Sequence, residues 1–288
     1  RESRSMPDIH HTAIVHPHAE LADDVSVGPY SLVGPDVVIG PGTSVGAHCV
    51  VENHTNIGAH NRIGHHVHLG GLPQDLKYRG ELATVEIGDN NEIRENVTVH
   101  IGTENGGGST SVGSNNFLMV GAHIAHDSHI GDNCILSNNV MLAGHIIVND
   151  HAIISGGAAV THYVTIGRYA FVGGLAGVVH DCPPFMVSDG HPNRVRTVNT
   201  IGLARHQFDA TTIDHLKRAY IALYGHRARK NHSQGQGGYA NLDLLERDLG
   251  DDPAVMELVA FIRRSAAAPN GRFAEVHRPD NKRAAPTR

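Results

Sequence analysis

A histidine- and aspartate-rich segment lies near the middle of the 288-residue chain. Residues 121–133 read GAHIAHDSHIGDN, so three histidines and two aspartates fall within a short stretch. Imidazole titrates near neutral pH, so such a histidine can act as a general base that a neighbouring carboxylate orients. The same residue types bind zinc. The segment therefore suggests acid–base catalysis, a metal site or the polar exterior of a repeat.

A six-residue repeat governs the elements that must position these side chains. Aliphatic residues recur at every sixth position from Val15 to Leu69, from Ile87 to Val99 and from Val112 to Val178. Small or β-branched residues usually stand two positions earlier, and residues two apart on a strand share a face, so both registers are predicted to point inward. This period is typical of a parallel β-helix.

The repeat also predicts the dimensions of the coil. Three six-residue units make a triangular coil of 18 residues, and neighbouring coils stack about 4.8 Å apart at the ordinary strand spacing. Glycine often follows the aliphatic residue, as at Gly28, Gly40 and Gly46. We expect these glycines to supply unusual backbone angles at the corners.

Two domains are predicted. Residues 7–190 form the β-helix, a mainly β fold, and the series breaks at two insertions, residues 71–86 and 101–111, which are expected to be loops on the outside of the coil. Residues 191–288 form a C-terminal α-helical domain.

The helical domain has its own local signals. Asp209 is expected to cap one helix that ends at Gly225, and Asp252 followed by Pro253 to begin another. Residues 231–238, NHSQGQGG, are expected to form a loop between them, and the chain after Pro269 to be frayed.

Composition excludes several classes of protein. The chain has no tryptophan and only 5 % aromatic residues, so we expect a narrow core of small aliphatic side chains. A net charge of −6 gives no basic footprint for nucleic acid. There is no apolar run long enough for a membrane span and no apolar signal-peptide segment at the start. The three cysteines form no CxxC pair, which fits a reducing cytoplasm.

The coil register places the central histidines. His123, His126 and Asp127 fall outside both inward registers, so they are predicted to face outward or to sit at a corner. Gly144 lies 18 residues after His126 and His145 lies 18 after Asp127, which predicts that each stands one coil away from its partner and that Gly144 leaves space beside a possible base. His100 is expected to approach the same edge.

A zinc site is the competing chemistry. Zinc needs three or four converging ligands, and although His60 and His65 have a suggestive spacing, no third ligand follows from the sequence.

Five motifs, in order and spacing, resemble one known family. They are PQDLKY (residues 73–78), IRENVTVH (93–100), AHIAHD (122–127), LAGH (142–145) and VGG (172–174). The family is the UDP-N-acetylglucosamine O-acyltransferases of lipid A biosynthesis. The resemblance implies a left-handed β-helix, a homotrimer with active sites between neighbouring subunits, and no metal or redox cofactor.

The resemblance also implies a reaction and its catalytic residues. A 3-hydroxyacyl group moves from acyl carrier protein to the 3-hydroxyl of UDP-N-acetylglucosamine. His126 corresponds to the general base, Asp127 to the residue that orients it, and the Gly144 N–H to the donor that stabilises the oxyanion.

Further positions correspond to substrate contacts in the family. They are Asp75, Lys77, His100, His123, His145, His162, Gly174, His191, Asn199 and Arg205. Arg205 resembles a diphosphate-binding arginine, and Gly174 occupies the position that limits acyl-chain length. His162 stands where the family commonly has glutamine, and His206 where a second basic residue is common.

Three other functions remain open at this point. An N-acyltransferase acting on an amino sugar nucleotide would need a similar base. A zinc enzyme of the γ-carbonic-anhydrase type shares the coil. A non-enzymatic scaffold would lack the grouping of His126, Asp127 and Gly144.

Overall fold

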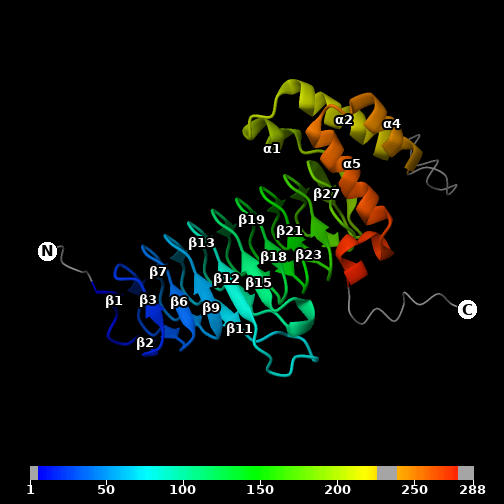
Figure 1. The fold of residues 1–288 in the computed structure, drawn as a ribbon. Helices are drawn as coiled ribbons and strands as arrows, with labels where there is room; N and C mark the ends of the chain where they lie inside the picture. Colours follow the sequence, from blue (N-terminus) through cyan, green and yellow to red (C-terminus); the bar gives the residue numbers. More distant parts are fainter. Residues whose placement is uncertain (1–5, 226–238, 278–288) are drawn as a thin grey trace, which may run out of the picture.

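The computed structural model describes residues 6–225 and 239–277. Most of them wind into a rod of stacked coils, with the N-terminus at one end and the C-terminal helices packed at the other (Figure 1). Each complete coil contributes one short strand to each of three sheets, so the predicted parallel β-helix is confirmed.

The strands group by sheet. Sheet A contains β1 (Asp8–Ile9), β4 (Ser26–Val27), β7 (Ser44–Val45), β10 (Arg62–Ile63), β13 (Glu92–Ile93), β16 (Phe117–Leu118), β19 (Ile135–Leu136), β22 (Ile153–Ile154), β25 (Phe171–Val172), β27 (Met186–Asp189) and β28 (Arg194–Val198). Sheet B contains β2 (Ile14–Val15), β5 (Leu32–Val33), β8 (Val50–Val51), β11 (His68–Gly71), β14 (Thr98–His100), β17 (His123–Ile124), β20 (Met141–Leu142), β23 (Ala159–Val160) and β26 (Gly177–Val178). Sheet C contains β3 (Glu20–Leu21), β6 (Val37–Ile39), β9 (His54–Ile57), β12 (Thr84–Ile87), β15 (Ser109–Val112), β18 (His129–Ile130), β21 (Ile147–Val148) and β24 (Thr165–Ile166).

The 18-residue register holds wherever no insertion intervenes. In sheet B, for example, His123 pairs with Met141, Met141 with Ala159, and Ala159 with Gly177. A sequence separation of 18 therefore translates directly into the distance between adjacent strands.

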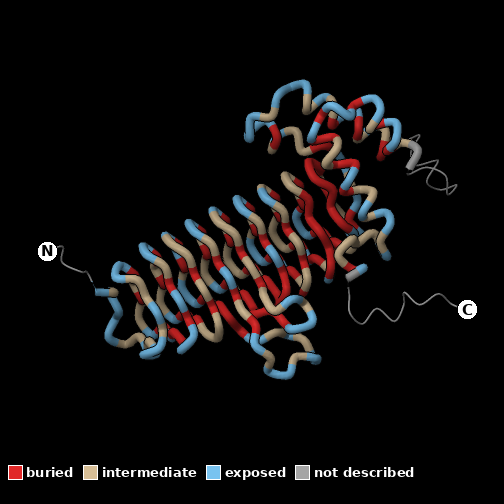
Figure 2. The backbone as a smooth tube through the Cα atoms, viewed as in Figure 1, coloured by how far each residue is buried: buried red, intermediate tan, exposed pale blue. Residues whose placement is uncertain are grey.

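Both predicted inward registers fill the interior. Val27 and Val33 are buried, and so are Val25 and Ser31, which stand two positions before them. The core of the coil consists of valine, isoleucine, leucine, alanine and cysteine, as its narrow cross-section requires. Buried residues alternate with intermediate and exposed residues along each turn of the coil (Figure 2).

The expectation about the corner glycines is wrong. Gly28 and Gly46 do not have positive φ; the left-handed positions come two residues later, at Tyr30 and His48, with φ of 58° and 55°. Gly46 is required instead by stacking, because a Cβ there would lie 2.5 Å from the backbone oxygen of Gly64 in the next coil. The rings of Tyr30 and His48 stack on one another at successive corners, with centroids 5.1 Å apart.

Both insertions are shorter than predicted. β12 begins at Thr84 and β15 at Ser109, so the loops span residues 72–83 and 101–108. Thr84 pairs with Ser109 as an ordinary ladder position. The predicted bounds were too wide because both strands begin with polar residues, which the pattern of aliphatic positions does not identify as part of the repeat.

The C-terminal region begins with a hairpin that the repeat did not predict. β27 stacks on β25 and pairs with the antiparallel β28, so the hairpin straddles the predicted boundary between residues 190 and 191. The helices are α1 (Thr200–Arg205), α2 (Ala210–Tyr224), α4 (Tyr239–Leu249) and α5 (Pro253–Ala266), with short 3₁₀ turns η1 (Glu104–Gly106), η2 (Pro269–Gly271) and η3 (Phe273–His277).

The predicted caps of two helices are confirmed. The Asp209 carboxylate accepts the N–H of Thr212 at the start of α2, Gly225 is the C-cap of the same helix, and Asp252 caps α5. α1 and α4 were not predicted, and the loop predicted at residues 231–238 lies outside the described residues.

The predicted fraying after Pro269 is wrong for residues 270–277, which are ordered against the coil. Asp181 in the last coil accepts hydrogen bonds from the Phe273 N–H, at 2.8 Å, and from the Ser265 hydroxyl, at 2.6 Å. This carboxylate fastens the C-terminal turns to the end of the coil. Within the described part of the chain, no helix is long and apolar enough to span a bilayer.

Candidate active site

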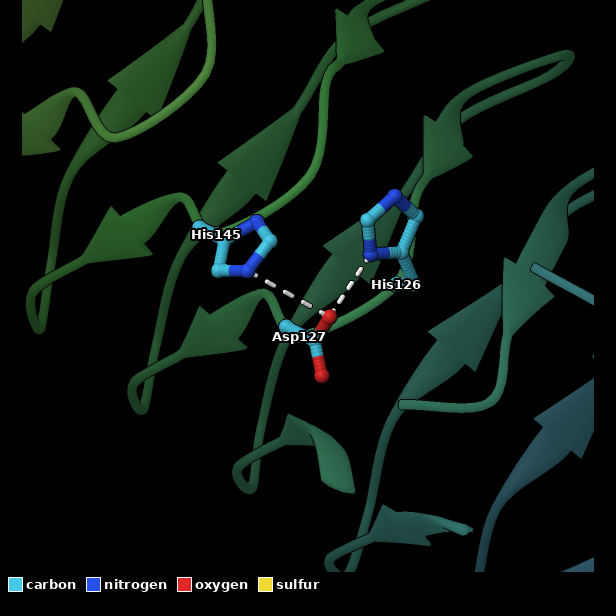
Figure 3. A group of neighbouring side chains, drawn as sticks. All are labelled: His126, Asp127 and His145. Atoms are coloured by element: carbon cyan, nitrogen blue, oxygen red, sulfur yellow. Dashed lines mark hydrogen bonds and ion pairs between the residues drawn. The ribbon is translucent and has the colours of Figure 1, made fainter. Parts of the chain in front are cut away.

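His126, Asp127 and His145 meet at the corner between sheets B and C. His126 and Asp127 join β17 to β18, and His145 occupies the equivalent corner of the next coil. The Nδ1 of His126 lies 2.7 Å from Oδ2 of Asp127, and Nε2 of His145 lies 3.6 Å from the same oxygen (Figure 3). The predicted stacking of His145 on Asp127 is therefore confirmed.

The His126–Asp127 pair lies outside the coil interior, yet it is not exposed. His126 is 6 % and Asp127 2 % exposed, because the second insertion covers the corner. Thr103, from that loop, donates its N–H to Oδ1 of Asp127 at 2.6 Å and its hydroxyl to Oδ2 at 2.8 Å. Sequence reasoning missed Thr103, and only the unusual glycine content of its loop could have drawn attention to it.

The backbone of Asp127 is also specialised. Its φ is 60°, in the left-handed region, and its N–H donates to the Thr110 hydroxyl at 2.8 Å. Aspartate tolerates this conformation better than most residues do. The corner therefore turns the carboxylate toward His126 and Thr103.

Asp127 is set to remain ionised. Burial raises the pKa of this carboxyl, but hydrogen bonds from His126 and Thr103 outweigh burial and hold the pKa below its usual range. An ionised carboxylate can only accept hydrogen bonds, so Nδ1 of His126 carries the proton that joins them. In the neutral ring, Nε2 of His126 is then the basic nitrogen.

The surrounding histidines favour their neutral forms. Burial, reinforced by the neighbouring His123, lowers the pKa of His100 to about 4. Burial also lowers the pKa of His123, whose Nδ1 lies 2.7 Å from the Thr98 hydroxyl. Burial lowers the pKa of His145, and the Asp127 charge offsets this only in part. These rings can therefore serve as hydrogen-bonding groups without adding positive charge.

Gly144 stands directly against the basic edge of His126, as the register predicted. A Cβ at Gly144 would lie 2.6 Å from Cε1 and 2.8 Å from Nε2 of His126. In the described part of the chain the Gly144 N–H donates to no carbonyl or side chain. A backbone donor is thus available beside the basic nitrogen.

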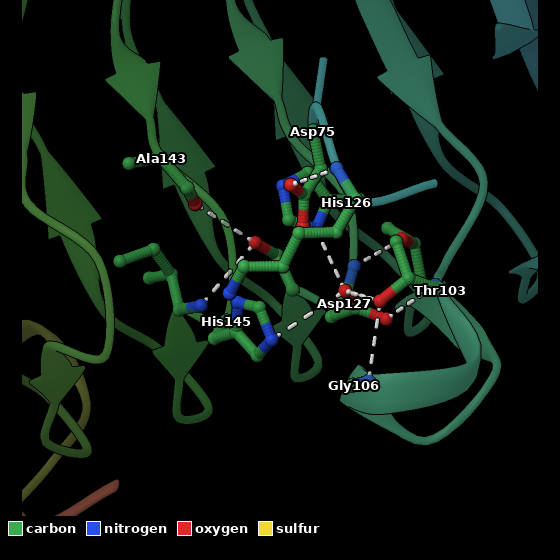
Figure 4. A network of polar contacts seen from close by, with 11 residues as sticks. Asp75, Thr103, Gly106, His126, Asp127, Ala143 and His145 are labelled. Carbon is green, nitrogen blue, oxygen red and sulfur yellow. Dashed lines mark hydrogen bonds and ion pairs between the residues drawn. The ribbon is translucent and has the colours of Figure 1, made fainter. Parts of the chain in front are cut away.

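A cavity of about 670 Å³ opens beside these groups. Five predicted site residues line it: His123, His126, Gly144, His162 and His191. Its apolar wall contains Met141, Ala159, Gly177 and Val179. Gln74 from the first insertion also lines it, and the next residue, Asp75, is close enough for its charge to act on His145 (both are labelled in Figure 4). His126 can therefore remove a proton from a hydroxyl group that is bound in the cavity next to its apolar wall.

Comparisons with known proteins agree with this geometry. Residues 181–269 match the family model described as UDP N-acetylglucosamine O-acyltransferase, domain 2, and residues 18–53 and 109–144 match the bacterial transferase hexapeptide model. A relative from Akkermansia muciniphila, named acyl-[acyl-carrier-protein]–UDP-N-acetylglucosamine O-acyltransferase, is 52 % identical over 246 residues, which are 84 % of this chain and 95 % of the relative. The chain belongs to the UDP-N-acetylglucosamine O-acyltransferase family.

Solved structures of the family have the same fold. LpxA from Acinetobacter baumannii is 37 % identical with a TM-score of 0.82, covering 87 % of this chain and 95 % of that one. The UDP-N-acetylglucosamine acyltransferase from Bacteroides fragilis is 35 % identical with a TM-score of 0.83, covering 88 % and 96 %. The fold is therefore the left-handed parallel β-helix with C-terminal helices that the family resemblance implied.

Seven of the ten residues that the acyltransferase family resemblance assigned to substrate do not line the cavity within one chain, among them Asn199, Arg205 and Gly174. Asn199 caps α1, where its Oδ1 accepts the Gly202 N–H at 3.1 Å and its Nδ2 donates to the Tyr169 carbonyl at 3.0 Å. Arg205 is exposed at the end of α1. Gly174 lies at a corner beyond the cavity, where a Cβ would come no closer than 3.5 Å to another atom.

The other four of these seven residues, Asp75, Lys77, His100 and His145, contact groups around the acyltransferase site. The Lys77 N–H donates to Oδ1 of Asp75 at 2.9 Å, so the first insertion holds both in one turn. His100 lies behind His123, with ring centroids 4.8 Å apart.

The geometry also bears on a metal site. Ligand atoms of His126, Asp127 and His145 lie within 4.8 Å of one another, a grouping different from the His60 and His65 that the sequence suggested. Both carboxylate oxygens of Asp127 already accept hydrogen bonds from protein donors. A metal ion would have to displace these donors, so the group fits a hydrogen-bonded catalytic pair better.

Proposed function

We propose that this chain transfers a 3-hydroxyacyl group from acyl carrier protein to the 3-hydroxyl of UDP-N-acetylglucosamine, the reaction that begins lipid A synthesis. The observation that carries the proposal is the His126–Asp127 pair with Gly144 directly against the His126 ring at the edge of a cavity, in a chain that shares 52 % identity with a relative of that name.

The residues divide the reaction between them. Nε2 of His126 takes the proton of the sugar hydroxyl as its oxygen attacks the thioester carbonyl, and Asp127 stabilises the imidazolium. The Gly144 N–H donates to the oxyanion of the tetrahedral intermediate. Collapse of the intermediate breaks the carbon–sulfur bond, and His126 returns its proton to the thiolate of the carrier. No covalent enzyme intermediate is required.

The cavity has a suitable place for each substrate. Met141, Ala159 and Gly177 offer an apolar floor for the acyl chain, since each buried methylene contributes about 0.8 kcal/mol. We assign Asp75, Lys77 and His123 to the sugar and to the acyl hydroxyl, because polar groups at this end can form hydrogen bonds with them.

We propose that the protein acts as a homotrimer in the cytoplasm. Asn199, Arg205 and Gly174 lie outside the cavity of a single chain, so a neighbouring subunit is needed to bring such residues to the substrates. The three cysteines are free and buried, which suits a reducing compartment.

Purified protein tests the function directly. UDP-N-acetylglucosamine is offered with a panel of 3-hydroxyacyl carrier proteins, and the product is analysed by mass and by its lability in mild alkali. An alkali-labile ester on the sugar is expected, and an alkali-stable product formed only with an amino sugar nucleotide would favour the N-acyltransferase.

His126→Ala provides the matched test of the base. We expect kcat to fall about 10²–10⁴-fold, with no change in the circular dichroism spectrum. A variant that keeps wild-type kcat would remove His126 from the mechanism.

A further inference from the structure

The second insertion contacts the catalytic corner through Thr103 and the backbone of Gly106. Thr103, which is 2 % exposed, reaches Asp127 across 24 positions of sequence and donates from both its N–H and its hydroxyl. No repeat register relates the two residues. Figure 4 shows Thr103 and His126 on either side of the same carboxylate.

We propose that Thr103 is a positioning residue for acyl transfer, because it holds the Asp127 carboxylate in the orientation that directs Nε2 of His126 toward the substrate. The inference rests on the proposed function. Thr103 does not line the cavity and acts only through Asp127.

The Thr103 hydroxyl accepts one hydrogen bond and donates another, and the one that it donates goes to Asp127. The Gly106 N–H donates to Oγ1 of Thr103 at 3.2 Å, so the Thr103 hydroxyl proton is left to point at Asp127, 2.8 Å away. Oδ2 of Asp127 also accepts from Nδ1 of His126. Three donors thus hold the two carboxylate oxygens, and the His126 ring is oriented by its hydrogen bond to one of them.

The loop is shaped to make this contact. Thr103 is the N-cap of η1, and a Cβ on Gly106 would fall 1.9 Å from Cγ of Asp127. The turn therefore needs glycine at position 106 to bring its backbone against the carboxylate. A loop that merely closed the coil would not require so close an approach.

Removing the hydroxyl has a predictable electrostatic effect. Asp127 would lose one donor, its charge would be less dispersed, and it would stabilise the His126 imidazolium more strongly. The acid limb of the kcat–pH profile should therefore move to higher pH. His145 also faces Asp127, and the other titratable groups around the pair are His100, His123, His129 and Asp75. They are unchanged in the variant.

Thr103→Val tests the proposal because valine matches threonine in shape and keeps the N–H. We expect kcat to fall about 10- to 100-fold through misorientation of the base, and KM for UDP-N-acetylglucosamine to stay within about twofold. The acid limb should rise by about half a pH unit or more. Thr103→Ser, which retains the hydroxyl, should recover most of kcat.

Thr43→Val is the matched control. Thr43 is equally buried in the coil, and its hydroxyl donates to the Gly58 carbonyl at 2.9 Å, far from the site. It should lower thermal stability without moving the acid limb. A merely structural role for Thr103 predicts the same pattern for Thr103→Val.

Two outcomes would overturn the inference. One is a folded Thr103→Val enzyme with wild-type kcat and an unmoved acid limb, and the other is a Thr103→Ser enzyme no better than Thr103→Val. If Thr103→Val does not fold, the same readouts on Thr103→Ala decide. A wild-type protein that transfers no acyl group refutes the proposed function instead.

Discussion

Gly144→Ala adds one methyl group at a position where the structure leaves little room beside the His126 ring. The new Cβ would stand 2.6 Å from Cε1 and 2.8 Å from Nε2 of His126, whereas ordinary contact begins near 3.4 Å. The imidazole must therefore move by about 0.8 Å, and it is held by its hydrogen bond to Asp127. Gly144 does not have positive φ, so the backbone itself accepts alanine without strain.

The displacement translates into a rate. A misplacement of about 1 Å in a catalytic group can cost about 10²-fold, which corresponds to roughly 2.7 kcal/mol at the transition state. We therefore expect kcat for acyl transfer to fall about 100-fold in Gly144→Ala. The melting temperature should change little, because the methyl group meets a side chain at the cavity wall and no interior position is altered.

The assay follows acyl transfer by mass, with the melting curve recorded on the same preparation. Gly156→Ala is the matched control, since it lies at another corner of the coil, has ordinary φ, and its Cβ meets one atom, the Asn138 oxygen, at 3.3 Å. It should retain wild-type kcat. If Gly144→Ala keeps kcat within threefold of wild type, the close packing of Gly144 on the base has no role in catalysis.

Three further predictions concern pH, metal and chain length. Burial lowers the pKa of His100 from 6.5 to about 4 in the folded protein. Between these pH values His100 is protonated in the unfolded chain but not in the folded one. The free energy of unfolding should therefore fall by up to roughly 3 kcal/mol as the pH drops from 6.5 toward 4. Denaturant titrations at both ends of this window should show a smaller decrease for His100→Asn, and equal decreases would contradict the assignment. Metal analysis should find no stoichiometric zinc and chelation should not reduce activity; one tightly bound zinc per subunit would favour the metal-dependent alternative. Gly174→Met should shift donor preference from fourteen-carbon toward ten-carbon chains, since each methylene excluded from the groove costs about 0.8 kcal/mol, and an unchanged preference would place the chain-length limit elsewhere.

Much of the coil follows from the sequence because its contacts are periodic. Once six-residue units are recognised, a separation of 18 becomes a distance of one strand, and this predicted that Gly144 and His145 would stack on His126 and Asp127. The helices that begin after Asp209 and Asp252 were predictable for a similar reason, since capping is a local interaction.

The insertions and the C-terminal hairpin have no such period. Thr103 reaches Asp127 only because the second loop folds back over the corner, and β28 pairs with β27 in the antiparallel direction outside the repeat. Contacts of this kind depend on how a loop packs, which spacing alone does not encode.

By itself, then, the sequence determined the fold, the stacking of the catalytic pair on the next coil, and the family. Only the tertiary structure decided that the pair is buried, that Thr103 contacts its carboxylate, and that glycines such as Gly46, which follow the aliphatic residues, serve coil packing and not backbone angles. The physical reason is that periodic neighbours are fixed by the count of residues, whereas burial, close approach and the direction of a hydrogen bond are fixed by which surfaces finally meet.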